Sequence, residues 1–186
     1  MVQTWILDSG DIDPVQLVKS GDDVSICGGC FHRGNRDRKR SCYVNVGQAP
    51  LAVWRGWKRG IYSGNWNGET FKGLKVRLGA YGDPAAVPLA IWDEVLSETE
   101  SHTGYTHQWK SERLRDVMKY CQASLDNEPD IKRLKALPVI QNGNGIKSKN
   151  AGYFRVLPIG GSPAIGELLC PATTTSYASC STCMMC

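Results

Sequence analysis

The sequence predicts an α/β fold, either a partial (βα) barrel or a curved, mostly parallel sheet with a cysteine-rich, irregular C-terminal tail. Two observations predict it. Short apolar runs alternate with amphipathic stretches along the chain, and no internal repeat or low-complexity linker interrupts them. A length of 186 residues fits a single domain, residues 1–186, whose cluster-binding tail covers 160–186. About five predicted strands are too few for a complete barrel of eight.

The strands are predicted from alternating or β-branched apolar residues. They cover 24–27, 74–78, 103–107, 120–125 and 153–158, with a further extended segment at 42–46. Consecutive βα units imply right-handed crossovers and a parallel sheet. Such sheets bind ligands at the carboxyl ends of their strands. The polar residues expected there are Asp83, His107, Asp126 and Arg155, with Tyr81 and Trp109 as candidate pocket walls.

Proline and capping residues mark the predicted helices. Pro50 opens a helix over 51–58, and Asp83 caps another over 85–98, with Pro84 at its first position. Two more helices are predicted at 111–119, capped by Ser111, and at 129–137. Gly-rich and Asn-rich composition indicates loops at 62–72 and 142–150.

We expect neither an export signal nor a membrane helix. Residues 1–8 lack a basic start, and the apolar runs are short throughout the chain. A chain that is not exported keeps its thiols reduced. Its eight cysteines are therefore candidate metal ligands or reactive groups rather than disulfides.

Four cysteines in the C-terminal tail have a spacing typical of iron–sulfur ligands. They form the pattern Cys170-x9-Cys180-x2-Cys183-x2-Cys186. Tandem C-x2-C-x2-C with a more distant fourth cysteine is an iron–sulfur pattern, whereas zinc more often takes two separated pairs together with histidine. No histidine lies near this tail. We expect a [4Fe-4S] cluster here, with zinc, disulfides and reactive thiols as alternatives.

A second, incomplete set consists of Cys27, Cys30 and Cys42, in the pattern C-x2-C-x11-C. Its fourth ligand is left open between Cys121, His32, a carboxylate and a small molecule on an open iron. Structural bracing, a zinc knuckle completed by His32, and one site shared by both cysteine groups are the alternatives. Cys121 stands alone in an apolar strand and is expected to be a small buried side chain.

The net charge of +4 is concentrated in a basic loop between two cysteines. Its cations are Arg33, Arg36, Arg38, Lys39 and Arg40. A solvated loop is the simplest interpretation. Binding of nucleic-acid phosphates by the Arg33–Arg40 loop, within a zinc-stabilised module, is one alternative. Compensation of thiolate charge at a nearby cluster is another.

Three long motifs resemble segments of a known protein family. They are CYVNVGQAPLAVW at 42–54, RLGAYGDPAAVP at 77–88 and TGYTHQW at 103–109, joined by Cys170-Pro171-Ala172 and the three closing cysteines. From residue 27 to the end, the chain resembles an uncharacterised family of bacteriophage-encoded iron–sulfur proteins, marine phages among them. The resemblance implies a phage protein in the cytoplasm of an infected bacterial host, with a redox or cluster-assembly protein of host or phage as partner. It implies no particular reaction, so enzyme activity stays open.

A more distant similarity is to the radical SAM barrel. Gly82-Asp83-Pro84 occupies a place comparable to the Gly-Glu-Pro segment of that family, and the triad Cys27, Cys30 and Cys42 lies near the first predicted strand. This similarity implies S-adenosylmethionine bound to an open iron. The cysteine spacing departs from the C-x3-C-x2-C that is usual there.

Overall fold

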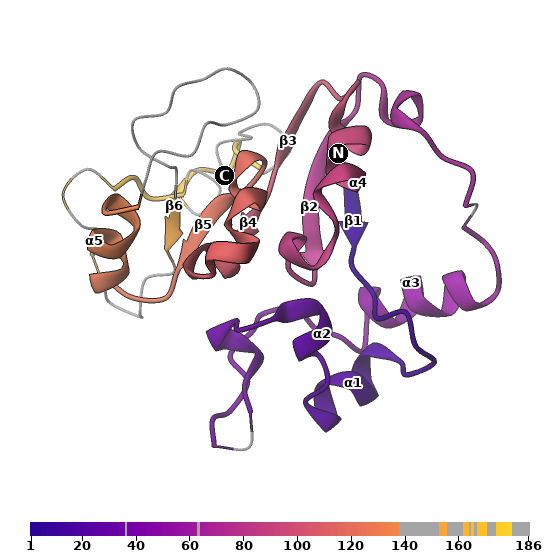
Figure 1. Cartoon of the computed structure of the whole chain (residues 1–186), viewed down its shortest axis with the longest axis horizontal. Helices are drawn as coiled ribbons and strands as arrows, with labels where there is room; N and C mark the ends of the chain where they lie inside the picture. Colours follow the sequence, from indigo (N-terminus) through magenta and orange to yellow (C-terminus); the bar gives the residue numbers. More distant parts are fainter. Residues whose placement is uncertain are drawn as a thin grey trace.

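The computed structural model describes residues 1–35, 37–62, 64–137, 153–155, 162–163, 165, 167–170 and 174–179. These residues form a mixed α/β structure with two parallel sheets of three strands, and they form no closed barrel (Figure 1). The first sheet contains β1 (Val2–Trp5), β2 (Lys75–Tyr81) and β3 (Ser101–Thr103), in that order. The second contains β4 (Tyr105–Thr106), β5 (Gln122–Leu125) and β6 (Tyr153–Arg155).

A single residue, Gly104, separates β3 from β4 and so joins the two sheets. Its carbonyl oxygen accepts a hydrogen bond from the backbone N–H of Gln122 at 2.9 Å. A Cβ atom at this position would lie 2.9 Å from the Cβ of Leu78 and 3.2 Å from the Sγ of Cys121. Glycine is therefore required where the strand passes closely over the core.

Helices connect and cover the strands. The α-helices are α1 (Pro14–Ser20), α2 (Val24–Cys27), α3 (Ala49–Lys58), α4 (Leu89–Leu96) and α5 (Pro129–Lys135). The 3-10 helices are η1 (Phe31–Arg33), η2 (Gly68–Phe71), η3 (Pro84–Ala86), η4 (Gln108–Lys110) and η5 (Glu112–Lys119). Figure 1 shows α1, α2 and α3 grouped beyond the carboxyl ends of β1 and β2. Among the described helices, none has the length and hydropathy needed to cross a membrane.

Two hydrophobic clusters accompany the two sheets. The first contains Ile6, Leu17, Ile26, Val76, Leu78, Tyr81, Trp92, Val95, Val117 and Cys121. The second contains Trp109, Met118, Ala123, Leu125, Ile131 and Leu134. Each cluster includes one buried indole whose N–H is satisfied: Trp92 donates to the Pro84 carbonyl at 2.9 Å and Trp109 to that of Ser124 at 2.8 Å. The buried indoles therefore incur no penalty for an unpaired N–H.

Most predicted elements are confirmed with small shifts of their bounds. β2, β5, α3 and α5 match the predicted segments 74–78, 120–125, 51–58 and 129–137. The strand expected at 103–107 is divided at Gly104, and the helix expected at 85–98 is divided into η3 and α4 by Val87 and Pro88. The segment 42–46 has no regular structure, and 111–119 is a 3-10 helix that the Ser111 side chain does not cap.

The strand predicted at 24–27 is wrong. This segment is the single helical turn α2, in which the N–H of Cys27 donates to the Asp23 carbonyl at 2.8 Å. The first strand of the fold is β1 instead, which pairs with β2 at the edge of the sheet. Of the predicted strand 153–158, only β6 lies within the described residues, and the loop 142–150 and most of the tail 160–186 lie outside them.

Candidate metal centre at the cysteine loop

Residues 27–42 form the cysteine loop, which gathers three of the predicted ligands. The N–H of Cys30 donates to the carbonyl of Cys27 at 3.2 Å, which closes a tight turn between these two cysteines. The chain then reverses, and the N–H of Cys42 donates to the carbonyl of His32 at 2.9 Å. Burial, together with the charges of Asp23, Cys30 and Cys42, raises the pKa of Cys27 to about 12. The turn and the chain reversal bring the three cysteines into one short loop.

The cysteine loop is anchored on one side by a buried carboxylate. Asp23 is only 2% exposed, and its Oδ1 accepts hydrogen bonds from Nε and Nη2 of Arg33 at 3.1 and 2.8 Å. Nη1 of Arg40 lies 3.5 Å from Oδ2 of the same residue. Two cations of the basic loop therefore point into the protein. A third, Arg38, lies 3.9 Å from the ring centroid of Phe31. These three arginines stabilise the loop itself.

The carboxyl edge of the sheets holds the loop from the other side. Nε2 of Gln108 donates to the Cys27 carbonyl at 3.0 Å, and Oε1 of Gln108 accepts from the N–H of Gly29 at 3.2 Å. The N–H of Asp83 donates to the Ile26 carbonyl at 2.7 Å. Gly28 has φ +55°, and a Cβ there would lie 2.6 Å from the Gln108 side chain. This close approach explains a glycine after Cys27.

Asp83 organises the strand ends next to the loop. Its carboxylate accepts hydrogen bonds from the N–H of Ala85 at 3.0 Å, from Oγ1 of Thr106 at 2.7 Å and from the N–H of His107 at 2.8 Å. Burial raises the pKa of Asp83, and these three hydrogen bonds oppose the shift. The predicted cap at Asp83 is confirmed, and it also ties β2 to β4.

His107 and Asp126 face the loop from the ends of β4 and β5. Nδ1 of His107 lies 3.3 Å from Oδ1 of Asp126, in an ion pair without hydrogen-bond alignment. Burial lowers the pKa of His107, but contacts with Asp126 and Cys30 outweigh it and bring the pKa to about 9. Lys110 donates to Oδ2 of Asp126 at 3.0 Å. The sheet edge therefore holds the His107 imidazole beside Asp126, with its ring centroid 5.5 Å from that of His32 in the cysteine loop.

The Tyr81 hydroxyl completes the surroundings of the thiols. Tyr81 is 2% exposed, and its hydroxyl is buried without a hydrogen-bond partner among the described residues. Burial raises the pKa of Tyr81, and the nearby Cys27 adds to the shift. A buried hydroxyl beside thiols and without a partner is costly unless another group occupies the space between them.

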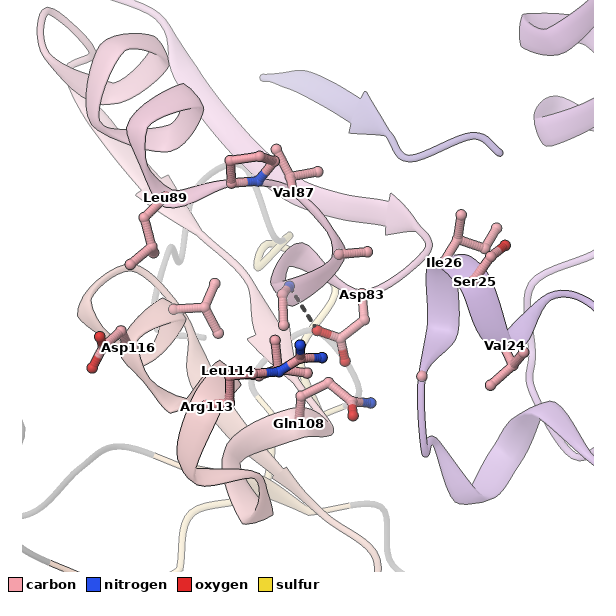
Figure 2. Close-up of a pocket in the computed structure, with 15 residues that line it drawn as sticks. Val24, Ser25, Ile26, Asp83, Val87, Leu89, Gln108, Arg113, Leu114 and Asp116 are labelled. Carbon is pink, nitrogen blue, oxygen red and sulfur yellow. Dashed lines mark hydrogen bonds between the residues drawn. The ribbon is translucent and has the colours of Figure 1, made fainter. Parts of the chain in front are cut away.

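A cavity of about 590 Å³ lies beside the loop. Figure 2 shows Val24, Ser25 and Ile26 of α2 on one side and Asp83, Gln108 and Arg113 on the other. Its volume is in the range of small-molecule sites. Two of its lining residues, Asp83 and Gln108, also fix the cysteine loop, so a ligand in the cavity would adjoin the loop at Gly28, whereas no cysteine lines the cavity. Neither Tyr81 nor Trp109 lines it, so the prediction of both as pocket walls is wrong for this cavity.

The remaining predicted ligands differ in their placement. Cys121 is 6% exposed and packs in the first hydrophobic cluster, as expected for a small buried side chain. Cys170 is half-buried, whereas Cys180, Cys183 and Cys186 lie outside the described residues. Within the described part of the chain, no three His, Cys, Asp or Glu side chains stand at the spacing of a single bound metal ion. Arg155, expected at a strand end, forms an ion pair with Glu167 at 2.5 Å.

Sequence reasoning missed two residues that position the loop. Gln108 lies in the motif TGYTHQW, which carried a family resemblance, but its type alone indicates no role. Asp23 precedes α2 and has no local pattern that distinguishes it from Asp22. Comparisons of the chain with protein-family models, with curated proteins and with solved structures gave no match. Function therefore has to be argued from the site.

Proposed function

We propose that the chain is a phage iron–sulfur protein that binds at least one [4Fe-4S] cluster. One observation supports the proposal: the loop that contains Cys27, Cys30 and Cys42 folds back on itself and is hydrogen-bonded to the strand ends through Asp83 and Gln108. The donor set fits the group, because thiolates are the ordinary ligands of iron–sulfur clusters. The tail cysteines Cys170, Cys180, Cys183 and Cys186 are proposed to bind a cluster on the strength of their spacing.

A cluster and a single zinc ion differ in the spacing that their ligands need. A tetrahedral zinc site with Zn–S bonds of about 2.3 Å brings its sulfurs to roughly 3.8 Å from one another. No three donors in the described ranges stand in such a group. A cubane is larger, and each cysteine binds a different corner, so its ligands stand farther apart. The choice of a cluster over zinc therefore rests on the spacing of the tail cysteines in the sequence.

The proposed roles are electron transfer, cluster delivery or chemistry at an open iron. Each requires a partner or substrate to reach the cluster. We propose a redox or cluster-assembly protein of the phage or its host, with the cytoplasm of the infected bacterium as the place of action. Parallel α/β folds place their functional groups at the carboxyl edge of the sheet. The position of the cysteine loop at this edge supports a functional role for it rather than a purely structural one.

Iron and sulfide counting on anaerobically purified chain tests the proposal. We expect about four of each per chain for one cluster and about eight for two. Cys30→Ala and Cys183→Ala should each lose iron, whereas Cys121→Ala should keep it, because Cys121 packs in the core. A colourless protein with one zinc per chain would contradict the proposal.

A radical SAM-like enzyme is the second candidate, and the cavity beside the loop favours it. The cavity adjoins Gly28 and Asp83, and its 590 Å³ is enough for a small organic cofactor or substrate. S-adenosylmethionine added to the reduced cluster should then change its electron paramagnetic resonance spectrum. An unchanged spectrum from an iron-loaded chain would remove this candidate and leave the iron–sulfur proposal intact.

A further inference from the structure

The carboxyl end of α3 carries cations that have no acidic neighbours in the sequence. Between positions 38 and 68 the chain has six Lys and Arg and no Asp or Glu, so positive charge is concentrated in this stretch. Arg55 and Arg59 stand four residues apart and therefore share one face at the end of the helix. Both are exposed, and neither side chain forms a hydrogen bond or an ion pair with the described residues. These two cations are therefore available to an anionic partner.

The chain beyond α3 folds back and lays an aromatic ring on the helix. The N–H of Gly60, which has φ +69°, donates to the carbonyl of Trp57 at 2.8 Å. The N–H of Ile61 donates to the Gly56 carbonyl at 3.1 Å. A Cβ at Gly56 would lie 2.9 Å from Cε2 of Tyr62, so the tyrosine ring packs directly against the helix backbone. Tyr62 is nevertheless 54% exposed, so part of its ring faces solvent.

Trp57 supplies a second ring next to a cation. It is 40% exposed, and Nζ of Lys58 lies 4.6 Å from its ring centroid. Lys58 also forms an ion pair with Asp11, whose side chain is almost fully exposed. Exposed pairs contribute little free energy, so Lys58 can exchange Asp11 for another anion. The five residues that make up this α3 patch are Arg55, Trp57, Lys58, Arg59 and Tyr62.

Exposed rings among cations are suited to single-stranded nucleic acid. Bases of any sequence stack on aromatic side chains, while Lys and Arg contact the phosphates. A duplex hides the faces of its bases, so the rings favour a single strand. The exposed residues of α3 include one large apolar side chain, Trp57, which is too few for a helix that lies in a membrane surface. The basic loop is a poorer site for phosphates, because Arg33 and Arg40 are paired with buried Asp23.

We propose that the α3 patch binds single-stranded nucleic acid. Bases stack on the rings of Trp57 and Tyr62. The phosphates beside these bases contact Arg55, Lys58 and Arg59. This function is separate from the proposed cluster and does not depend on it.

Fluorescence anisotropy of a labelled oligothymidine of about 12 nucleotides tests the inference, in salt of about 50 to 200 mM. Three phosphate contacts predict that the logarithm of the affinity falls against the logarithm of the salt concentration with a slope of about −2. Trp57→Ala should weaken binding about 5–100-fold, whereas Trp57→Phe keeps a ring and most of the affinity. Arg55→Gln combined with Arg59→Gln should make the slope shallower by about 1.4. Because both arginines are exposed and unpaired among the described residues, this double variant should unfold at the same denaturant midpoint as the original chain.

Two control variants lie outside the α3 patch. Trp66→Ala removes a ring of similar exposure, 37%, and Arg113→Gln removes an exposed arginine that has no partner among the described residues. Both variants should bind the oligothymidine with the affinity of the original chain.

Several outcomes would overturn the inference. They are no binding at about 50 mM salt, binding that the patch variants leave unchanged, and a duplex of the same length bound as tightly as the single strand. Binding to phosphatidylserine vesicles without binding to oligothymidine would assign the α3 patch to a membrane surface and would also overturn it. Iron and sulfide counts measure the proposed cluster separately, so an iron-free chain that binds oligothymidine would contradict the proposed function and support this inference.

Discussion

Nε2 of Gln108 donates a hydrogen bond to the carbonyl oxygen of Cys27 at 3.0 Å, across 81 residues of sequence. The same amide accepts from the N–H of Gly29 at 3.2 Å. One side chain from the sheet edge therefore satisfies a donor and an acceptor of the turn that carries two cysteines. The stability of that turn depends on a residue outside the proposed ligand set.

Gln108→Ala should destabilise the chain by about 1–3 kcal/mol, because it leaves two part-buried backbone groups unpaired. It should also lower the iron content, since the turn at Cys27 is no longer held. Chemical denaturation and iron analysis measure the two effects. Gln48→Ala is the control, because Gln48 is exposed and makes no side-chain capping bond at the start of α3. Equal unfolding free energies for the two variants would contradict the assigned role.

Asp23→Ala should be the most damaging change to the ion pairs of the basic loop. Asp23 is 2% exposed and compensates Arg33 and Arg40, so its removal leaves two part-buried guanidinium groups without this counter-charge. Losing one partner of a buried ion pair costs about 3–5 kcal/mol. The exposed pair of Lys72 and Glu69 at 3.7 Å is the comparison, and Glu69→Ala should cost under about 1 kcal/mol. Thermal unfolding of both variants measures the difference.

Gly104→Ala should destabilise the junction of the two sheets by roughly 1–3 kcal/mol. The added methyl would lie 2.9 Å from Cβ of Leu78 and 3.2 Å from Sγ of Cys121, neither of which is the free end of a flexible chain. Gly64→Ala is the control, because nothing lies within 4 Å of the place that its added methyl would take. Denaturant midpoints compare them, and a Gly104→Ala midpoint equal to that of Gly64→Ala would contradict the close packing.

Asp126 should give the iron-free chain a specific acid sensitivity. Burial raises its pKa, but the close contact with His107, the hydrogen bond from Lys110 and the charges of both outweigh it and bring the pKa to about 2, below the ordinary 3.8. A depressed carboxyl pKa stabilises the fold above the unfolded-state value, and the contribution is lost as pH falls through the folded-state value. The destabilisation caused by Asp126→Asn should therefore be constant between about pH 5 and pH 6 and shrink towards pH 2. It should also shrink as pH rises from the ordinary histidine pKa of 6.5 to about 9, because His107 then loses its charge. A difference that does not vary with pH would contradict the ion pair.

The sheet was more predictable than the site. The strand β2 alternates buried and half-buried residues, so its period is visible in the sequence. The turn α2 contains the β-branched residues Val24 and Ile26, which favour a strand, but only Ile26 is buried and the helical turn is fixed by contacts from outside. Tertiary contacts therefore override the local strand propensity of this segment. The strand β1 was not predicted, because its four residues are exposed or half-buried and show no clear apolar alternation.

The cysteines of the site could be found by spacing, and the strand-end residues His107 and Asp126 by their place after apolar runs. The contact between His107 and Asp126 could not be predicted, because it depends on the pairing of β4 with β5. It also depends on the position of the loop that follows α2. Gln108 and Asp23 act through individual hydrogen bonds and ion pairs between separate segments of the chain. Such contacts produce no recognisable pattern in a single amino-acid sequence.

The separation between Cys27 and Gln108 has a consequence for synthesis of the chain. The ribosome makes Cys42 roughly 80 residues before Asp126, which at about 5–20 residues per second is a delay of about 4–16 seconds. For most of that interval the three thiols are in or beyond the exit tunnel, while Gln108, which holds the loop from the sheet edge, is still untranslated. The cluster proposed above would therefore find the loop held on both sides only in the finished protein, because the nascent chain lacks the contacts of Gln108. The order of residues along the chain favours loading of the proposed cluster after translation.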